Sequence, residues 1–194
     1  MTKHMESCMD FSPLFESDNT FCIEGSNFHL EQCKNVKSVE FITLHDNNIL
    51  YFVEAKRTAP NPDAPENKEN VDKYFHDLTG KIQQSIDMLV SKEVGVNVDA
   101  DNEFPACFGG SAFSKYKLIF LLIIRNSQKE WCSDVQTKLQ RELLALRKIW
   151  KLEVIVLAGN DAIRKRFVSK FVCKQDNTAW AGYSNCPRPN CEGV

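Results

Sequence analysis

The sequence predicts an α/β fold in which a mixed central β-sheet is flanked by helices. Two observations support this: a β-hairpin pattern in the first third of the chain, and alternating helical and strand-like segments after it. A chain of 194 residues, 43% hydrophobic and 26% charged, suits one domain with a sizeable core.

The hairpin is predicted from residues 36–44 and 49–56, which are rich in β-branched and aromatic residues. Between them, His45-Asp46-Asn47-Asn48 has the composition of a turn. Three prolines then occur within residues 58–65 and exclude regular structure there. This break separates two elements of one domain.

Helices and buried strands are expected to alternate after the break. Apolar residues recur at three- and four-residue steps over residues 71–89, which predicts an amphipathic helix, whereas residues 95–114 lack periodicity and indicate a long loop. The expected elements after the loop are a fully buried strand at 117–125, a helix at 135–150, a buried strand at 154–159 and a basic helical segment at 161–174.

The two ends of the chain are expected to lie outside this core. Residues 1–35 are interpreted as a segment packing on the core, with a short helix around 13–17 and a short strand around 21–24. Residues 36–174 form the main α/β domain, and residues 175–194 form a polar C-terminal tail.

Membrane and secretory signals are absent from the sequence pattern. The longest apolar run, residues 118–124, is far shorter than the roughly 20 residues that a spanning helix needs. The first residues are followed by acidic and polar ones instead of an apolar signal region. We therefore expect a soluble cytoplasmic protein that does not interact with membranes.

Charge is distributed unevenly along the chain although the net charge is only −2. Residues 1–114 carry nine Lys/Arg and nineteen Asp/Glu, whereas residues 115–174 carry fourteen Lys/Arg and five Asp/Glu. An acidic metal-binding part beside a basic phosphate-binding part is one interpretation, and mutual neutralisation of two faces is the other.

Glu54 and Lys56 are the main chemical signal. Alternate residues of a strand share a face, so these two side chains project together. If His45 pairs with Ile49, Glu40 lies opposite Glu54, with Cβ atoms roughly 4.5–5.5 Å apart. A one-residue shift in register would instead send Glu40 to the other face.

Two opposed carboxylates repel unless a cation lies between them, and their oxygen atoms suit Mg²⁺ or Mn²⁺. A neighbouring lysine can position or deprotonate water, or stabilise charge on a phosphate. The alternative is that Glu54 and Lys56 form an exposed ion pair of little energetic consequence.

Val39-Glu40 followed by Phe52-Val53-Glu54-Ala55-Lys56 resembles the PD-(D/E)xK superfamily of restriction-endonuclease-like nucleases, over residues 36–157. The resemblance implies an αβββαβ core and hydrolysis of phosphodiesters with Mg²⁺ or Mn²⁺. It also implies that Glu40 and Glu54 are catalytic metal ligands, that the Ala55 carbonyl is a further ligand, and that Lys56 is the catalytic lysine.

One position departs from the family pattern, and several others allow more than one assignment. Glu40 stands where Asp is commoner and lacks a preceding proline, and Asp46 is an alternative acid in the turn. Gln83 or Gln84 resembles the glutamine that RecB-like members place near the metal. Candidates for the N-terminal helical acid of some members are Glu16, Glu24 and Glu31.

The leading hypothesis is a metal-dependent nuclease that acts on nucleic acid, with DNA as the expected substrate. Arg164, Lys165 and Arg166 are the expected phosphate contacts. The rival hypothesis is a nuclease-fold binding or assembly module that keeps Glu54 and Lys56 but has no turnover. A protein partner or a homodimer is compatible with either.

Overall fold

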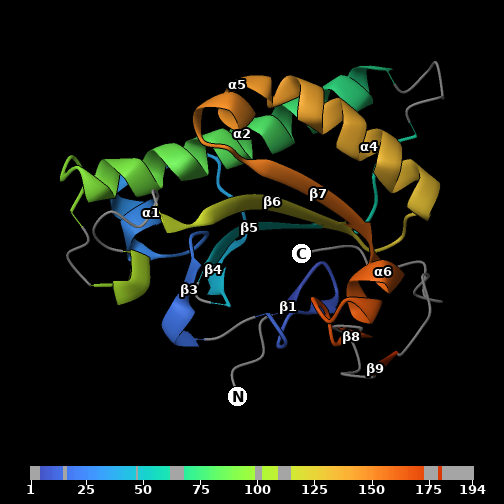
Figure 1. Cartoon of the computed structure of the whole chain (residues 1–194), viewed down its shortest axis with the longest axis horizontal. Helices are drawn as coiled ribbons and strands as arrows, with labels where there is room; N and C mark the ends of the chain where they lie inside the picture. The colour runs from blue at the N-terminus through green and yellow to red at the C-terminus, as the bar shows by residue number, and fades with distance from the viewer. Residues whose placement is uncertain are drawn as a thin grey trace.

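The computed structural model describes residues 5–14, 17–46, 48–61, 68–98, 102–108, 115–172 and 179–180. Its centre is a five-stranded mixed sheet of order β3-β4-β5-β6-β7, and the predicted mixed α/β architecture is confirmed (Figure 1). The helices α2, α4 and α5 lie on one face of this sheet, and α6 with a small four-stranded sheet, β1-β2-β8-β9, lies on the other (Figure 1). The bounds of these elements follow.

The antiparallel half of the main sheet contains β3 (Thr20–Cys22), β4 (Phe41–His45) and β5 (Ile49–Lys56). The expected hairpin is confirmed with its register, because His45 pairs with Ile49 and Phe41 pairs with Val53. β4 begins at Phe41 and not at residue 36, because the preceding backbone is bound to a helix. Lys37 N–H donates to Gln84 Oε1 (2.6 Å), and Val39 N–H donates to Ser85 Oγ (2.9 Å).

The parallel half adds β6 (Lys117–Ile124) and β7 (Glu153–Ala158) to β5. β6 was expected to be a central strand buried on both faces, and all its residues except Lys117 are buried. Lys56, Ile124 and Ala158 are neighbours across the three strands. The carboxyl ends of β5, β6 and β7 therefore meet at one edge of the sheet.

The helices over the first face are α2 (Lys68–Glu93), α4 (Lys129–Glu142) and α5 (Leu144–Ile149). α2 contains the predicted amphipathic helix. The single helix expected at 135–150 is instead divided at Leu143, whose N–H still donates to Leu139 O. The Gln140 carbonyl near the break accepts a hydrogen bond from Arg147 Nη1 (3.0 Å). The long loop before β6 holds a 3-10 turn, η3 (Ala106–Phe108).

The basic helix predicted at 161–174 is shorter in the structure than expected. The helix α6 covers only Gly159–Arg164, and Arg166 has a φ of 62°, which turns the chain away from the helix axis. The following segment forms β8 (Lys170–Val172), which pairs with β2. The reason is burial: Val168 and Phe171 are 1% and 0% exposed against the second face of the sheet.

The N-terminal segment supplies both sheets. β1 (Met5–Glu6) and β2 (Met9–Asp10) form a tight hairpin whose turn residues, Ser7 and Cys8, have φ of 47° and 60°. The strand expected near 21–24 is β3, whereas the helix expected at 13–17 includes residues outside those described. The remaining elements are the 3-10 turn η1 (Ser17–Asn19), α1 (Asn27–Gln32) and, within the expected tail, β9 (Ala179–Trp180).

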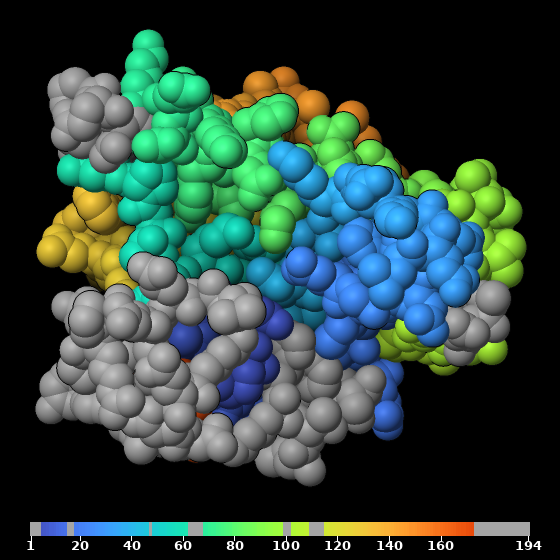
Figure 2. Space-filling model, turned by 180° about the vertical axis from the view of Figure 1, so that it is seen from behind, coloured from blue at the N-terminus to red at the C-terminus, as the bar shows by residue number. Residues whose placement is uncertain are grey.

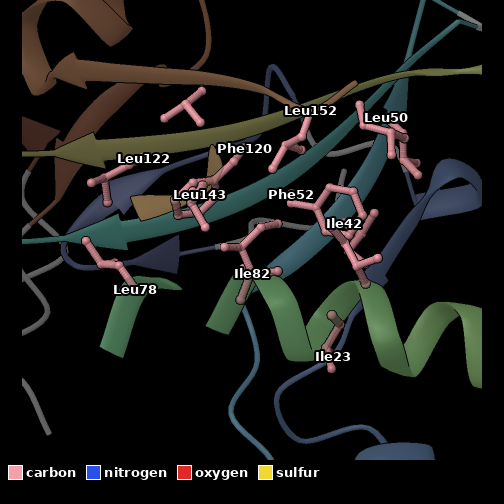
Figure 3. Packing of buried hydrophobic residues seen from close by; sticks show 14 of the residues in the cluster. Ile23, Ile42, Leu50, Phe52, Leu78, Ile82, Phe120, Leu122, Leu143 and Leu152 are labelled. Carbon is pink, nitrogen blue, oxygen red and sulfur yellow. The ribbon is translucent and has the colours of Figure 1, made fainter. Parts of the chain in front are cut away.

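Each face of the sheet has its own hydrophobic core. On the first face, Phe52 of β5 and Phe120 of β6 pack with Ile82 of α2 (Figure 3). On the second face, Val53 and Leu121 pack with Phe171 and with N-terminal residues. Strand alternation explains this division, since consecutive residues of β5 point to opposite cores. None of the helices in the described ranges is long and apolar enough to span a membrane.

We expect Gly159→Ala to destabilise the protein by about 1–3 kcal/mol, because the added methyl group would overpack the start of α6. A Cβ there would lie 2.7 Å from both Arg125 O and Phe171 Cζ. Gly80→Ala is the matched control. Its Cβ would meet only the side chains of Lys37 (3.4 Å) and Gln84 (3.8 Å), so this change within α2 should be neutral or stabilise by up to about 1 kcal/mol. Urea unfolding of both variants measures the difference, and equal stabilities would contradict it.

Candidate active site

Glu54 is a fully buried carboxylate near the end of β5. It is 0% exposed and follows Phe52 by two residues, so it points to the same face, beneath α2. Its Oε2 is shielded from solvent and has no hydrogen-bond partner. A buried ionised group is costly unless it is paired, so the partners of Glu54 Oε1 determine whether the carboxylate is tolerated.

Two lysines hold the other oxygen of this carboxylate. Lys56 Nζ lies 2.8 Å and Lys81 Nζ lies 2.9 Å from Glu54 Oε1. The two lysine side chains are only 27% and 15% exposed, so the Glu54–Lys56 pair is not the solvent-exposed ion pair of the alternative interpretation. Burial lowers the pKa of Lys81, but the charge and hydrogen bond of Glu54, together with the charge of Glu40, raise it overall. Lys81 therefore stays an ammonium group.

Glu40 lies on the adjacent chain segment, directly before β4. Its N–H donates to Val53 O (3.1 Å), although Val53 is the residue that pairs with Phe41, so the regular register of β4 with β5 ends at Phe41. Burial and the charge of Glu54 raise the pKa of Glu40 from 4.5 to about 8. Glu40 therefore lies close enough to Glu54 and Lys81 for their charges to shift its pKa. That Glu40 shares one face of the sheet with Glu54 and Lys56 stays a prediction.

More acidic side chains surround Glu40. The charges of Glu6, in β1, and Glu24, in the turn before α1, also raise its pKa, whereas Lys81 lowers it. Of the three residues considered for an N-terminal acid, Glu24 is therefore the one that interacts with the site. Glu31 lies in α1 and is exposed, and Glu16 lies outside the described residues.

The Ala55 carbonyl, expected to be a metal ligand, already has a hydrogen-bond partner. Ser7 Oγ, at the tip of the β1–β2 hairpin, donates to Ala55 O at 3.0 Å. The carbonyl oxygen retains a second lone pair. The hairpin therefore lies beside the site, and its tip belongs to the site's surroundings.

Sequence reasoning missed the contribution of α2. Lys81 binds Glu54, and the hydroxyl of Tyr74 is buried without a hydrogen-bond partner. Burial and the charge of Glu54 raise the pKa of Tyr74, so its hydroxyl remains protonated and can donate. Both residues follow the apolar periodicity of α2 closely enough to face inward, but this pattern alone did not distinguish them from other polar residues of the helix.

Three other candidates take no part in the cluster. Gln83 is exposed, and Gln84 uses its Oε1 to bind Lys37 N–H. Asp46 lies in the β4–β5 turn with a φ of 51°, at the opposite end of β5 from Glu54. Figure 2 shows the segment that leads into β4 lying against α2, which is where Lys37 also pairs with Asp77 (3.0 Å).

The basic residues of α6 and of the turn after it lie at the same end of the sheet as Lys56. α6 begins directly after β7, and Ala158, Ile124 and Lys56 are neighbours across the sheet. Arg164 and Lys165 line a groove of about 430 Å³ together with Lys129 at the start of α4. Arg164 also pairs with Asp161. Arg166 is exposed and is not among the residues that line the groove.

The described residues of the site offer few ligands for a cation such as Mg²⁺ or Mn²⁺. Glu40 and Glu54 supply two carboxylates, and the unpartnered Glu54 Oε2 is available to a ligand. Mg²⁺ is commonly bound through only one or two carboxylates and keeps several waters. Within the described ranges, no group of three or more His, Cys, Asp or Glu side chains could hold a metal ion.

No protein-family model, curated protein or solved structure matches the chain.

The metal-free protein should lose stability relative to Glu40→Gln as the pH rises from about 4.5 to about 8. In this interval the unfolded chain ionises Glu40 while the folded chain keeps it protonated, because the folded pKa is raised from 4.5 to about 8. Glutamine resembles the protonated acid at every pH. Urea unfolding in EDTA at several pH values measures the difference between the two proteins. A difference that does not change with pH would contradict the burial of Glu40 beside Glu54.

Lys81→Met should destabilise the protein by about 1–3 kcal/mol, because it leaves the buried Glu54 with one ionic partner. Lys56→Met removes a more exposed partner and should cost roughly 1 kcal/mol or less. In the background of Glu54→Gln, the cost of Lys81→Met should shrink, which a double-mutant cycle by urea unfolding measures. Additive costs would show that the Lys81–Glu54 pair does not stabilise the fold.

Proposed function

We propose that the protein is a metal-dependent nuclease that hydrolyses phosphodiester bonds of nucleic acid, with DNA as its substrate. The observation that carries the proposal is the buried Glu54 carboxylate, which is bound by Lys56 and Lys81 and faced by Glu40 from the adjacent segment. Such a cluster costs folding free energy, so a role in ligand binding or chemistry explains its presence better than a role in stability.

Glu40 and Glu54 would hold a Mg²⁺ or Mn²⁺ ion. When bound, the ion supplies an activated water and neutralises charge on the phosphate. Glu40 must lose its proton to become a ligand, and a nearby cation favours this loss. Lys81, held as an ammonium by Glu54 and Glu40, fixes the orientation of the Glu54 carboxylate.

Lys56 is the residue assigned to the reacting phosphate. Its ammonium group contacts Glu54 at 2.8 Å but is more exposed than that of Lys81. It can therefore approach a phosphate from the open side and stabilise the negative charge that develops in the transition state. Lys81 is a positioning residue, because it acts through Glu54.

The groove lined by Lys129, Arg164 and Lys165 is the proposed path for the nucleic-acid backbone. It lies at the carboxyl end of β7, two strand spacings or about 10 Å across the sheet from β5. The side chains of Lys129, Arg164 and Lys165 offer several donors to phosphate oxygens, and Asp161, which pairs with Arg164, lines the same groove. Arg166 is not assigned to this path.

The fold is compatible with the family resemblance. We propose that β4, β5, β6 and β7, with α2 between β5 and β6, correspond to the restriction-endonuclease-like core. The antiparallel β4–β5 pair followed by parallel β6 and β7 supports this correspondence. The position of Glu54 and Lys56 at the end of β5 supports it as well.

A binding module without turnover is the second candidate, and one contact favours it. Ser7 Oγ occupies the Ala55 carbonyl that the resemblance assigns to the metal. In this alternative, Glu54 and its two lysines would be retained for binding or assembly. The cleavage experiment below separates the two candidates.

Purified protein should cleave plasmid or single-stranded DNA in Mg²⁺ or Mn²⁺ and lose this activity in EDTA. Glu54→Gln and Lys56→Ala should each reduce the cleavage rate by about 100-fold or more, because each removes a metal ligand or a group that stabilises the transition state. Asp46→Asn is the control, since Asp46 lies at the far end of β5. Cleavage rates are measured on gels. Absence of cleavage in both metals by a protein that still binds DNA would favour the binding module.

The variant Lys129→Gln/Lys165→Gln should weaken DNA binding and reduce the slope of log affinity against log salt by about 2, because two phosphate contacts are lost. Lys34→Gln/Lys148→Gln removes the same charge from exposed positions outside the groove and serves as the control. Fluorescence anisotropy at several salt concentrations measures both slopes. Equal slopes for the two double variants would exclude the groove as the binding path.

A further inference from the structure

Arg125 is a buried cation on the face of the sheet opposite Glu54. It directly follows β6 and is 1% exposed, and it is the largest of the fully buried side chains. Its Nε and Nη1 are shielded from solvent and have no hydrogen-bond acceptor. No carboxylate among the described residues forms an ion pair with it.

The surroundings of Arg125 hold its guanidinium in place. The group lies over the ring of Phe171 in β8, 5.0 Å from the ring centroid. Gly159, at the start of α6, approaches so closely that an added Cβ would lie 2.7 Å from Arg125 O. Arg125 N–H donates to Lys56 O (2.9 Å), and Asn126 N–H donates to Arg57 O (2.9 Å), so the neighbouring strand end carries further cationic residues.

The contact with Phe171 offsets only part of the cost of burying this charge. A buried lysine can reduce such a cost by losing its proton, but a guanidinium stays charged in proteins. Asp10, a buried acid of β2 on this face, accepts a hydrogen bond from Ser12 N–H (3.0 Å); burial raises its pKa, but Ser12, Ser169 and Lys170 lower it overall. The positive charge of Arg125 therefore lacks a counter-charge within the described chain.

We infer that Arg125 is the centre of a second binding site, which takes an oxyanion of the phosphate type. An oxyanion supplies both the negative charge that Arg125 lacks and an acceptor for an unpartnered guanidinium nitrogen, and charge-assisted hydrogen bonds to arginine are strong. The site lies at the carboxyl ends of β5, β6 and β7, where open α/β sheets commonly bind ligands. It is separated from Glu54 by the sheet itself and does not rest on the proposed nuclease activity.

Thermal unfolding in sodium phosphate, compared with sodium chloride of equal ionic strength, tests this site. Because Arg125 is shielded, the protein is first unfolded and then refolded in each salt. We expect a saturable rise in the unfolding temperature of the parent in phosphate. Adenosine monophosphate, a short oligonucleotide and acetate are tested in the same way, which distinguishes free phosphate, a nucleotide phosphate and a carboxylate as the source of the oxyanion.

Arg125→Met should abolish the response, and Arg125→Lys, which keeps the charge but not the two-nitrogen geometry, should weaken it at least about tenfold. Arg141→Met removes a charge from an exposed position of α4 and should leave the response unchanged. Arg125→Lys decides the question if Arg125→Met does not fold. No saturable response of the parent to any of the oxyanions, or an unaltered response in Arg125→Lys, would overturn the inference. These outcomes do not depend on whether the protein cleaves DNA.

Discussion

The carboxylate of Glu54 is buried against the first face of the sheet, and the geometry around it depends on keeping it charged. Two lysines from different elements, Lys56 of β5 and Lys81 of α2, bind the same oxygen. Removing a charged carboxylate from water is unfavourable, so α2 must lie where Lys81 can reach it. The same helix holds the segment before β4 through Gln84 and Ser85, which places Glu40 beside Glu54. One electrostatic requirement thus connects the hairpin, the helix and the candidate site.

The site combines two groups whose pKa values are both raised, so that the acid favours its neutral form and the base its charged form. Glu40 favours its neutral form, because burial and neighbouring acids raise its pKa to about 8. Lys81 favours its charged form because the acids around it outweigh burial. Perturbed pKa values of this kind are common at functional sites. Structural ion pairs rarely leave a buried carboxylate oxygen without a partner, as Glu54 Oε2 is here.

The two faces of the sheet hold different buried ionisable groups. The face beneath α2 holds Glu54 with its two lysines and Glu40, whereas the face beneath the small sheet holds Arg125 over Phe171. Both features lie near the carboxyl ends of the parallel strands, where β5, β6 and β7 meet. Strand alternation keeps them apart, since neighbouring residues along a strand point to opposite faces. We propose a metal cation as the ligand of one face and an oxyanion as the ligand of the other.

The sequence by itself determined the hairpin and its register, the long helix after it and the two buried parallel strands, because local periodicity and turn chemistry act over short distances. It also placed Glu54 and Lys56 on one face, where their side chains form an ion pair. Only the tertiary structure decided which residue of α2 reaches Glu54, how Ser7 meets Ala55 O, and that the basic segment after Arg164 becomes a strand. Lys81, Gln83 and Gln84 are all polar residues of α2, and only the docking of this helix decides that the side chain of Lys81 points toward Glu54. The β2–β8 pairing joins segments roughly 160 residues apart. Contacts between such distant segments are fixed by packing of the whole chain, which no local pattern records.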